Sequence, residues 1–240
     1  MNSVEGLEPV VEDWQKALAV VAHPDDLEFG SAAAIARWTG QGKEIVYCLL
    51  TSGEAGIDGI APAECGPLRE GEQIESARIV GVSTVEFLGQ PDGTIEYGVA
   101  LRRLITDVIR RHQPEIVITN NFRGTWDGDV VLNQADHINT GHATLDAVRD
   151  AANRWIFPEA GDRWGGVRQV WATGSPQARH AADTTDTFDI GVKSLKAHKA
   201  YIDGLNWPHF DPEEFLEGTS RPAGTRLGTK YATRFEVFTL

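Results

Sequence analysis

The sequence lacks several features that would place it in a specialised class of protein. Its 240 residues include only two cysteines, Cys48 and Cys65, which is too few for a disulfide framework. No segment reaches the roughly 18 consecutive apolar residues of a membrane-spanning helix. Residues 1–16 contain no apolar core, so they do not resemble a secretory signal. These absences favour a protein of the cytoplasm with no membrane span.

Positive charge is scarce as well. The chain has 22 lysines and arginines against 35 aspartates and glutamates, a formal net charge of −13. Nucleic acids and anionic membrane surfaces are bound through basic patches, so we expect neither as a partner. A small neutral or cationic molecule is a more suitable ligand for a chain with this negative net charge.

Strand-like and helix-like patterns alternate along most of the chain. Apolar runs predict strands at residues 17–22, 43–50, 84–88, 114–119 and 169–173, with further candidates at 186–190 and, as an edge strand, 234–239. Helical spacing predicts helices at residues 31–38, 68–80, 99–111, 140–153 and 191–201. This alternation indicates one α/β domain over residues 1–240, with a Rossmann-like, doubly wound, mostly parallel sheet in three layers. Residues 206–228, rich in proline, glycine and charge, are expected to form an irregular loop or lid.

The end of the first predicted strand carries the most informative residues. His23, Asp25 and Asp26 follow the apolar run directly, at the sheet edge where open α/β proteins place their chemistry. A dinucleotide-binding protein would have glycines here, to let the pyrophosphate approach the backbone. An imidazole and two carboxylates suit a divalent metal instead.

A second polar pair follows the fourth predicted strand. Asp136 and His137 end the loop that begins at Asn120. If the first and fourth strands are neighbours, the two loops meet, and His23, Asp26 and His137 form a catalytic metal site of two histidines and one carboxylate. Asp25 would then stand beside the metal-bound water as general base. Each residue alone has a structural explanation, such as Asp26 capping the next helix, but their joint occurrence at two strand ends favours a metal.

These motifs resemble the LmbE/PIG-L family of metal-dependent deacetylases. The similarity spans roughly residues 17–203 and includes Ala22–Glu28 (AHPDDLE), Thr51–Gly56 (TSGEAG), Leu68–Glu72 (LREGE), Phe87–Gly93 (FLGQPDG), Asp136-His137 and Lys196–His198 (KAH). The resemblance implies an LmbE-like fold and removal of the acetyl group from N-acetylglucosamine units of small molecules or lipids.

The resemblance also implies roles for individual residues. His23, Asp26 and His137 would bind zinc, or iron(II) in its place, and Asp25 would be the base. Arg69 and Asp92 would reach sugar hydroxyls, Glu54 and Gly56 would shape the pocket floor, and Asp136 would orient His137 or a neighbouring residue. Without the resemblance, Arg69 would be interpreted as a solvated helix charge and Asp92 as a turn residue.

Three positions depart from the family pattern. Gln134 stands where the family often has a histidine, and glutamine can donate a hydrogen bond to an oxyanion but cannot deliver a proton. Either Asp25 therefore performs both proton transfers or another group assists. His198 lies in a changed segment and is a candidate for the pocket rim, whereas His142 is expected to be a surface or packing residue. The residues that follow Asp26, Leu27-Glu28-Phe29-Gly30, differ among branches of the family and disfavour one kind of thiol-pathway substrate.

The function that these residues predict is zinc-dependent hydrolysis of an N-acetyl amide in an amino sugar or glycoconjugate. Two alternatives stay open: an amidase of the same fold that cleaves another amide, such as a thiol conjugate or an acylated natural product, and a non-catalytic carbohydrate- or metal-binding relative. Trp126, Trp164 and Trp207, in predicted loops, could stack on sugars or pack internally, and Trp171 is expected in the core. The sequence leaves open whether the protein is a homo-oligomer.

Overall fold

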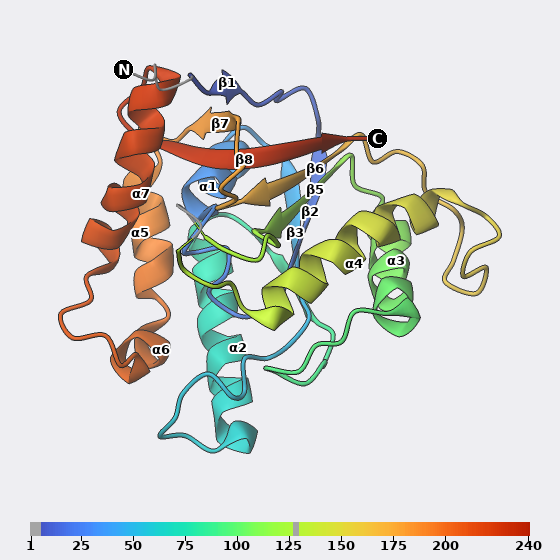
Figure 1. Cartoon of the computed structure of the whole chain (residues 1–240), viewed down its shortest axis with the longest axis horizontal. Coiled ribbons are helices and arrows are strands. Elements are labelled where there is room, and N and C mark those ends of the chain that lie inside the picture. The colour runs from blue at the N-terminus through green and yellow to red at the C-terminus, as the bar shows by residue number, and fades with distance from the viewer. Residues whose placement is uncertain (1–5, 127–129) are drawn as a thin grey trace.

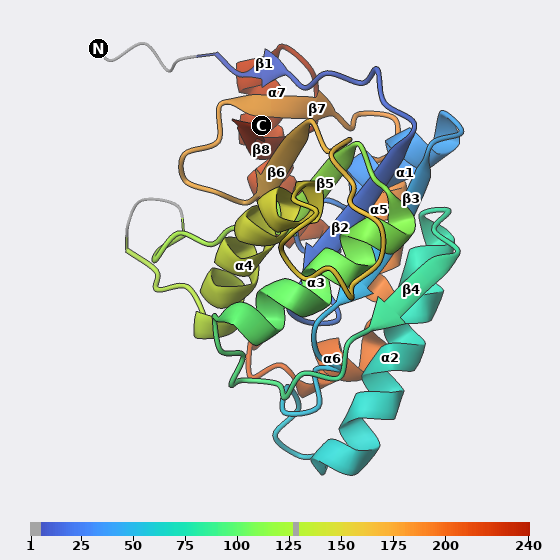
Figure 2. The same cartoon turned by 90° about the vertical axis from the view of Figure 1, so that its right-hand side faces the viewer.

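A single eight-stranded sheet organises the chain, in the strand order β1-β7-β8-β6-β5-β2-β3-β4 (Figures 1 and 2). The structure is a computed structural model that describes residues 6–126 and 130–240. The expectations for the N-terminal segment and for the loop after Asn120 fall partly on residues 1–5 and 127–129, which lie outside the described residues. The strands are β1 (Glu8–Pro9), β2 (Lys16–Val21), β3 (Glu44–Leu49), β4 (Thr84–Phe87), β5 (Ile116–Asn120), β6 (Gln169–Thr173), β7 (His180–Asp183) and β8 (Ala232–Thr239).

The sheet is mostly parallel, as the alternation of strands and helices predicts. β2 lies between β3 and β5 and pairs in parallel with both. Only β8 runs the other way, and it pairs with β6 on one side and β7 on the other. The first and fourth predicted strands, β2 and β5, are therefore neighbours, which is the arrangement that the metal-site hypothesis requires.

Helices cover both faces of the sheet, which completes three layers. In Figure 1, α3 and α4 lie on the right of the sheet, and α1, α2, α5, α6 and α7 lie on the left. The helices are α1 (Ala32–Gly40), α2 (Pro62–Ile79), α3 (Val99–His112), α4 (Ala135–Ala152), α5 (Phe188–Lys196), α6 (Lys199–Gly204) and α7 (Pro212–Leu227). None of the helices among the described residues is both long and apolar enough to cross a membrane.

The core has two halves because side chains alternate across each strand. Ala17, Ala19 and Val21 of β2 pack toward α1, whereas Leu18 and Val20 pack toward α3 and α4. Since β2 is buried on both faces, its sequence is continuously apolar, as is typical of a central parallel strand.

Residues 206–228 do not form the irregular loop that the sequence predicts. Most of them form α7, because Asp211 caps the helix by accepting hydrogen bonds from the main-chain N–H groups of Glu213 (2.8 Å) and Glu214 (2.9 Å). Pro212 occupies the first helical position, where its missing N–H is no loss, and Gly228 ends the helix with a φ of +88°. The proline and glycine that suggested a loop are helix-end signals.

Three further expectations need correction. The segment 186–190 is not a strand, because Phe188 begins α5 with Phe188, Val192 and Leu195 buried on one face. Helix α2 begins at Pro62 rather than residue 68, with Pro67 accommodated in its second turn. β8 is not an edge strand, since it pairs on both sides, and β1 occupies that edge instead.

The core cluster of Trp14, Trp38 and Trp171 gives a direct test of this fold. The three rings are completely buried and meet at centroid distances of 5.4–6.0 Å. We expect Trp171→Ala to lower the free energy of unfolding by about 3–5 kcal/mol, because it leaves a cavity. Urea titration followed by circular dichroism measures this change, and Trp155→Ala is the control because Trp155 is 82% exposed. Equal effects of the two substitutions would contradict the packing described here.

Candidate metal centre and active site

The turn after β2 places His23 and Asp26 at the sheet edge. One carboxylate oxygen of Asp26, Oδ2, accepts the main-chain N–H groups of Ala22 (3.0 Å) and His23 (2.9 Å). This turn fixes the carboxylate and leaves its other oxygen, Oδ1, directed at His137, which lies 2.9 Å away through Nε2.

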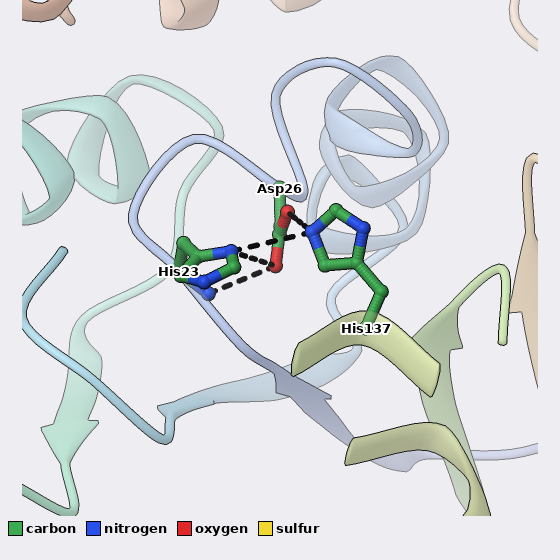
Figure 3. A group of neighbouring side chains, drawn as sticks. All are labelled: His23, Asp26 and His137. Atoms are coloured by element: carbon green, nitrogen blue, oxygen red, sulfur yellow. Dashed lines mark hydrogen bonds and ion pairs between the residues drawn. The ribbon is translucent and has the colours of Figure 1, made fainter. Parts of the chain in front are cut away.

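His137 comes from the first turn of α4, which begins at Ala135, and not from the preceding loop as the sequence suggested. Its Nε2 lies 3.2 Å from Nδ1 of His23. Figure 3 shows the two imidazoles facing each other with the Asp26 carboxylate beside them. The ligand atoms of His23, Asp26 and His137 all lie within 4.8 Å of one another, and all three residues are buried. The structure thus brings together the trio that the sequence singled out.

Hydrogen bonds on the far side of each ring determine which nitrogen faces the centre. Nε2 of His23 lies 3.1 Å from a carboxylate oxygen of Asp92 and 3.2 Å from one of Asp136. Nδ1 of His137 lies 2.9 Å from Oδ1 of Asn133. These acceptors favour a proton on the outer nitrogen of each ring, so the facing nitrogens, Nδ1 of His23 and Nε2 of His137, both present lone pairs.

This arrangement fits a bound divalent cation. Two lone pairs that face each other at 3.2 Å repel unless a proton or a cation lies between them. Two nitrogens bound to one tetrahedral zinc ion, at the usual bond length of about 2.0–2.1 Å, lie roughly 3.3 Å apart. The donor set of two imidazoles and one carboxylate is typical of catalytic zinc, with a position left for water. His23, Asp26 and His137 would hold the ion.

Negative charge gathers around these residues, which also suits a cation. Burial lowers the pKa of His23, but its hydrogen bonds to Asp136, Asp26 and Asp92 raise it by more, so the pKa lies well above its usual range. The same contacts hold the pKa of Asp92 and Asp136 low, against burial, which raises it. The pocket therefore stabilises positive charge at the position where the metal would sit.

Asp25, the expected general base, has a strained backbone. Its φ is +91°, in the left-handed region that non-glycine residues rarely adopt. Two buried side chains hold it there: Oε1 of Gln73 accepts the Asp25 N–H at 2.9 Å, and the Arg69 guanidinium pairs with carboxylate oxygen Oδ2. Such strain persists only where the surroundings enforce it, and it is concentrated at functional sites. Burial raises the pKa of the Asp25 carboxyl to about 6, against the opposing charge of Arg69.

Behind Asp25 lies a buried polar network. Nε2 of Gln73 donates to Oε1 of Glu28 at 3.0 Å, and the Ser76 hydroxyl donates to the same oxygen at 2.7 Å. Nε2 of His198 lies 3.4 Å from the other oxygen of Glu28. Glu28, the last residue of the first motif, thus orients Gln73, and Gln73 orients Asp25.

The remaining expected site residues fall into two groups. Arg69, Asp92 and Gln134 line a cavity of about 650 Å³ that opens over His23 and His137. Arg69 is 2% exposed and stacks under Tyr201, so it holds Asp25 in addition to facing the cavity. His198 is not at the pocket rim as expected, because it is completely buried against Glu28.

Other site residues take positions that the sequence left open or did not show. Asp136 orients His23 rather than His137 and is itself fixed by the N–H groups of Gly93 (2.8 Å) and Ile95 (3.0 Å). His142 is exposed on α4 and packs its ring 5.2 Å from that of Phe122, as expected for a packing residue.

The sequence analysis did not identify Gln73 and Asn133 as site residues. Asn133 lies four residues before His137, and this spacing could have indicated that the two side chains are in contact. Nothing in the sequence pairs Gln73 with Asp25.

The fold and the site together define a class of metal-dependent hydrolase. A model of the PIG-L family, described as GlcNAc-PI de-N-acetylase, matches residues 18–148, more than half of the chain. The chain belongs to this family.

Curated relatives agree with this assignment. A diacetylchitobiose deacetylase of Thermococcus kodakarensis is 27% identical, over 92% of this chain and 82% of that protein. A 1D-myo-inositol 2-acetamido-2-deoxy-alpha-D-glucopyranoside deacetylase of Saccharopolyspora erythraea is 28% identical, and the match covers 65% of this chain and 64% of that protein. The chain thus spans most of the first relative and somewhat less than two thirds of the second.

Solved structures show the same fold. The N,N'-diacetylchitobiose deacetylase of Pyrococcus horikoshii superposes with a TM-score of 0.85 at 22% identity, covering 95% of this chain and 85% of that one. GalB, a 4-carboxy-2-hydroxymuconate hydratase of Pseudomonas putida, superposes with a TM-score of 0.76 at 21% identity, covering 94% of this chain and 97% of that one. The second match shows that the fold also supports other chemistry, so the site has to carry the functional argument.

The contact between Asn133 and His137 predicts an effect on metal affinity. Nδ2 of Asn133 donates to the main-chain oxygens of Asn121 (2.7 Å) and Arg123 (2.9 Å), which fixes Oδ1 toward the imidazole. We expect Asn133→Ala to weaken zinc binding about 10- to 100-fold, as loss of such orienting contacts commonly does. Competition with a chromogenic chelator measures the affinity. Asn153→Ala, at the other end of α4, is the control and should leave the affinity unchanged.

The network behind Asp25 predicts an effect on turnover. Gln73→Leu removes the acceptor of the Asp25 N–H, a loss of about 1–3 kcal/mol for a buried group. We expect this free energy to be lost from the conformation in which Asp25 acts as base. In that case kcat drops about 5- to 150-fold, while KM and the metal content stay the same. Steady-state kinetics with elemental analysis test this, and Gln177→Leu, an exposed glutamine, is the control. An unchanged kcat in Gln73→Leu would show that Gln73 does not position Asp25.

Proposed function

We propose that this protein is a divalent-metal-dependent hydrolase that removes the acetyl group from the amide of a 2-acetamido sugar, in a small molecule or glycoconjugate. The observation that carries the proposal is the convergence of His23 and Asp26, from the turn after β2, with His137, from the first turn of α4. Asp25 lines the same cavity as these three residues. The amino-sugar deacetylases among its relatives support the substrate class.

We infer zinc as the metal, because two imidazoles and one carboxylate are the usual donors of catalytic zinc. Iron(II) also binds such a trio and is the alternative. The bound ion would supply a water of lowered pKa and would polarise the amide carbonyl.

The protein's own residues would handle the protons. Asp25 accepts a proton from the attacking water on its carboxylate and returns it to the leaving nitrogen, which departs as an amine while the acetyl group departs as acetate. Arg69 keeps the carboxylate in place through Oδ2. Gln134, at the cavity surface, would donate its amide N–H to the developing oxyanion. Because glutamine cannot supply a proton, Asp25 performs both transfers in this scheme.

Arg69 and Asp92 are proposed to contact sugar hydroxyls in addition to their contacts with Asp25 and His23. Both line the cavity beside the metal residues. The cytoplasmic location and the oligomeric state stay predictions. Both cysteines are buried free thiols, which is compatible with a reducing compartment.

Two alternative functions can be distinguished from this proposal by experiment: an amidase that cleaves a thiol conjugate, and a non-catalytic binding protein. A mycothiol S-conjugate amidase of Streptomyces coelicolor is 26% identical over 84% of this chain, which favours a thiol conjugate as the second candidate substrate. A non-catalytic binding protein would have no use for the strained conformation of Asp25, which Gln73 and Arg69 maintain.

The test is acetate release from a panel of N-acetylglucosaminides, with an acylated thiol conjugate included. We expect turnover of the sugars with zinc or iron(II) restored to the metal-free protein, and none in the presence of chelator. Turnover of the thiol conjugate alone would select the second candidate. If the sugars bind but are not hydrolysed with either metal, the protein is the non-catalytic binding protein.

Replacing the base gives a sharper test of the chemistry. Asp25→Asn keeps the shape of the side chain but cannot accept a proton, so kcat should fall at least about 100-fold, as is typical for loss of general acid–base catalysis. Elemental analysis should find the metal retained. Asp203→Asn, a substitution at an exposed aspartate, is the control. Undiminished turnover in Asp25→Asn would remove the assigned role.

A further inference from the structure

A second cavity adjoins the metal site and has no role in the chemistry described above. This side cavity has a volume of about 440 Å³, within the range of small-molecule sites. It shares eight lining residues with the main cavity over the metal residues, so the two cavities adjoin each other. The shared residues are Phe29, Gly30, Trp126, Val131, Thr173, Gly174, Trp207 and Phe215.

Two glycines lie at the boundary between the cavities. A Cβ atom at Gly30 would lie 2.9 Å from Cγ2 of Thr173, and one at Gly174 would lie 2.9 Å from the Trp126 ring. Gly174 also has a φ of +70°, which few other residues tolerate. A side chain at either position would therefore collide with Thr173 or Trp126, both of which line the two cavities.

The walls of the side cavity are mainly apolar. They come from α1, α5, α7 and the start of β8, and include Ala32, Ala33, Phe188 and Leu216. In Figure 1, α5 and α7 lie side by side on the left, and β8 runs from there across the sheet. Its two charged lining residues, Glu28 and Arg234, both have partners within the protein. A ligand in this cavity would gain mostly from burial of apolar surface.

The order of the strands sets the direction in which a substrate would lie. The metal residues follow β2 and β5, in the middle of the sheet. The polar cavity residues Arg69 and Asp92 lie on α2 and after β4, toward one edge. The side cavity lies beyond β5 in the other direction, at β6 and β8. The site thus has a polar side and an apolar side, with the metal residues between them.

A secondary amide bound across this site has its substituents on opposite sides of the C–N bond, because the trans form is favoured by about 2.5 kcal/mol. With the sugar on the polar side, the acyl group points toward the side cavity. We propose that the side cavity binds the acyl chain of an N-acylated amino sugar, so that the protein removes acyl groups longer than acetyl. This inference rests on the proposed function.

The reaction remains a simple hydrolysis. The oxygen of water bonds to the acyl carbon, the C–N bond breaks, and the amine takes up a proton as the fatty acid leaves. No reactant besides water is required, and the same Asp25 serves for short and long chains.

The test is a series of N-acyl glucosamines with acetyl, butanoyl, hexanoyl and octanoyl groups, followed by amine release. We expect kcat/KM of the zinc-loaded protein to rise about fourfold for each added methylene (about 0.8 kcal/mol) until the cavity is full. If kcat/KM stays constant or falls as the acyl group becomes longer than acetyl, the proposal is overturned. A parallel series of alkyl N-acetylglucosaminides places the chain on the other side of the amide. A rise in that series alone would assign the cavity to the aglycone and would also overturn it.

A matched pair of variants tests the location. Ser220 lines the side cavity but not the main one. Among the residues that the structure describes, its hydroxyl donates only to the main-chain oxygen of Leu216 in the same helix, at 2.7 Å. Ser220→Phe fills the cavity, so the dependence on chain length should disappear while acetyl hydrolysis remains, which also reports that the variant is folded. Ser220→Ala keeps the cavity and should behave like the unmodified protein. If Ser220→Phe leaves the dependence intact, the chain does not bind there.

Failure of the proposed function would be distinguishable from failure of this inference. Hydrolysis of the acetyl compound alone would reject only the acyl-chain site. If no compound is hydrolysed with any metal, calorimetry of the same series still decides the matter. Affinity that rises with acyl length, and loses this rise in Ser220→Phe, supports the site, whereas affinity independent of length rejects it.

Discussion

The parallel pairing of β2 with β5 is the constraint on which the site depends. Ala17, Leu18 and Ala19 of β2 lie opposite Ile116, Val117 and Ile118 of β5. Paired strands lie about 4.8 Å apart, so the turn after β2 and the start of α4, which follows β5, can also lie close together. This is how His23 and His137, 114 positions apart in the sequence, come to face each other at 3.2 Å. The strands can pair at the centre of the sheet because both are apolar on both faces, and helices cover both faces.

Once formed, this edge of the sheet concentrates buried carboxylates, which are unfavourable unless they are paired. The protein satisfies them in different ways. Main-chain N–H groups hold Asp26 and Asp136, His23 contacts Asp92, and Arg69 pairs with Asp25. Each of these contacts also fixes a side chain in the orientation that metal binding or proton transfer requires. The same hydrogen bonds that make the buried charges tolerable therefore preorganise the site.

The parts of this arrangement that the sequence predicted are those governed by local patterns. Continuous apolar runs identified β2, β3 and β5, and the polar residues in the segments that follow β2 and β5 identified the metal trio. The errors arose where local signals are ambiguous. Pro212 and Gly228 mark the ends of α7 but look like loop residues, and the alternation around Phe188 fits a strand over five residues although the longer helical spacing prevails. Gln73 and His198 could not be placed, because their partners Asp25 and Glu28 lie 48 and 170 positions away, and only the folded chain brings them together.

The metal residues and the walls of the side cavity come from different parts of the chain. The family match ends at residue 148, and the metal residues, Gln73 and Asn133 all precede that point. Most of the wall of the side cavity follows it, on α5, α7 and β8. The two parts tolerate change differently. A metal centre loses function when its ligands move by about 0.5 Å, whereas an apolar wall accepts substitutions that conserve its volume at a cost usually below about 1.5 kcal/mol. Substitutions in the C-terminal third of the chain can therefore change the shape of the side cavity without disturbing the pairing of β2 with β5.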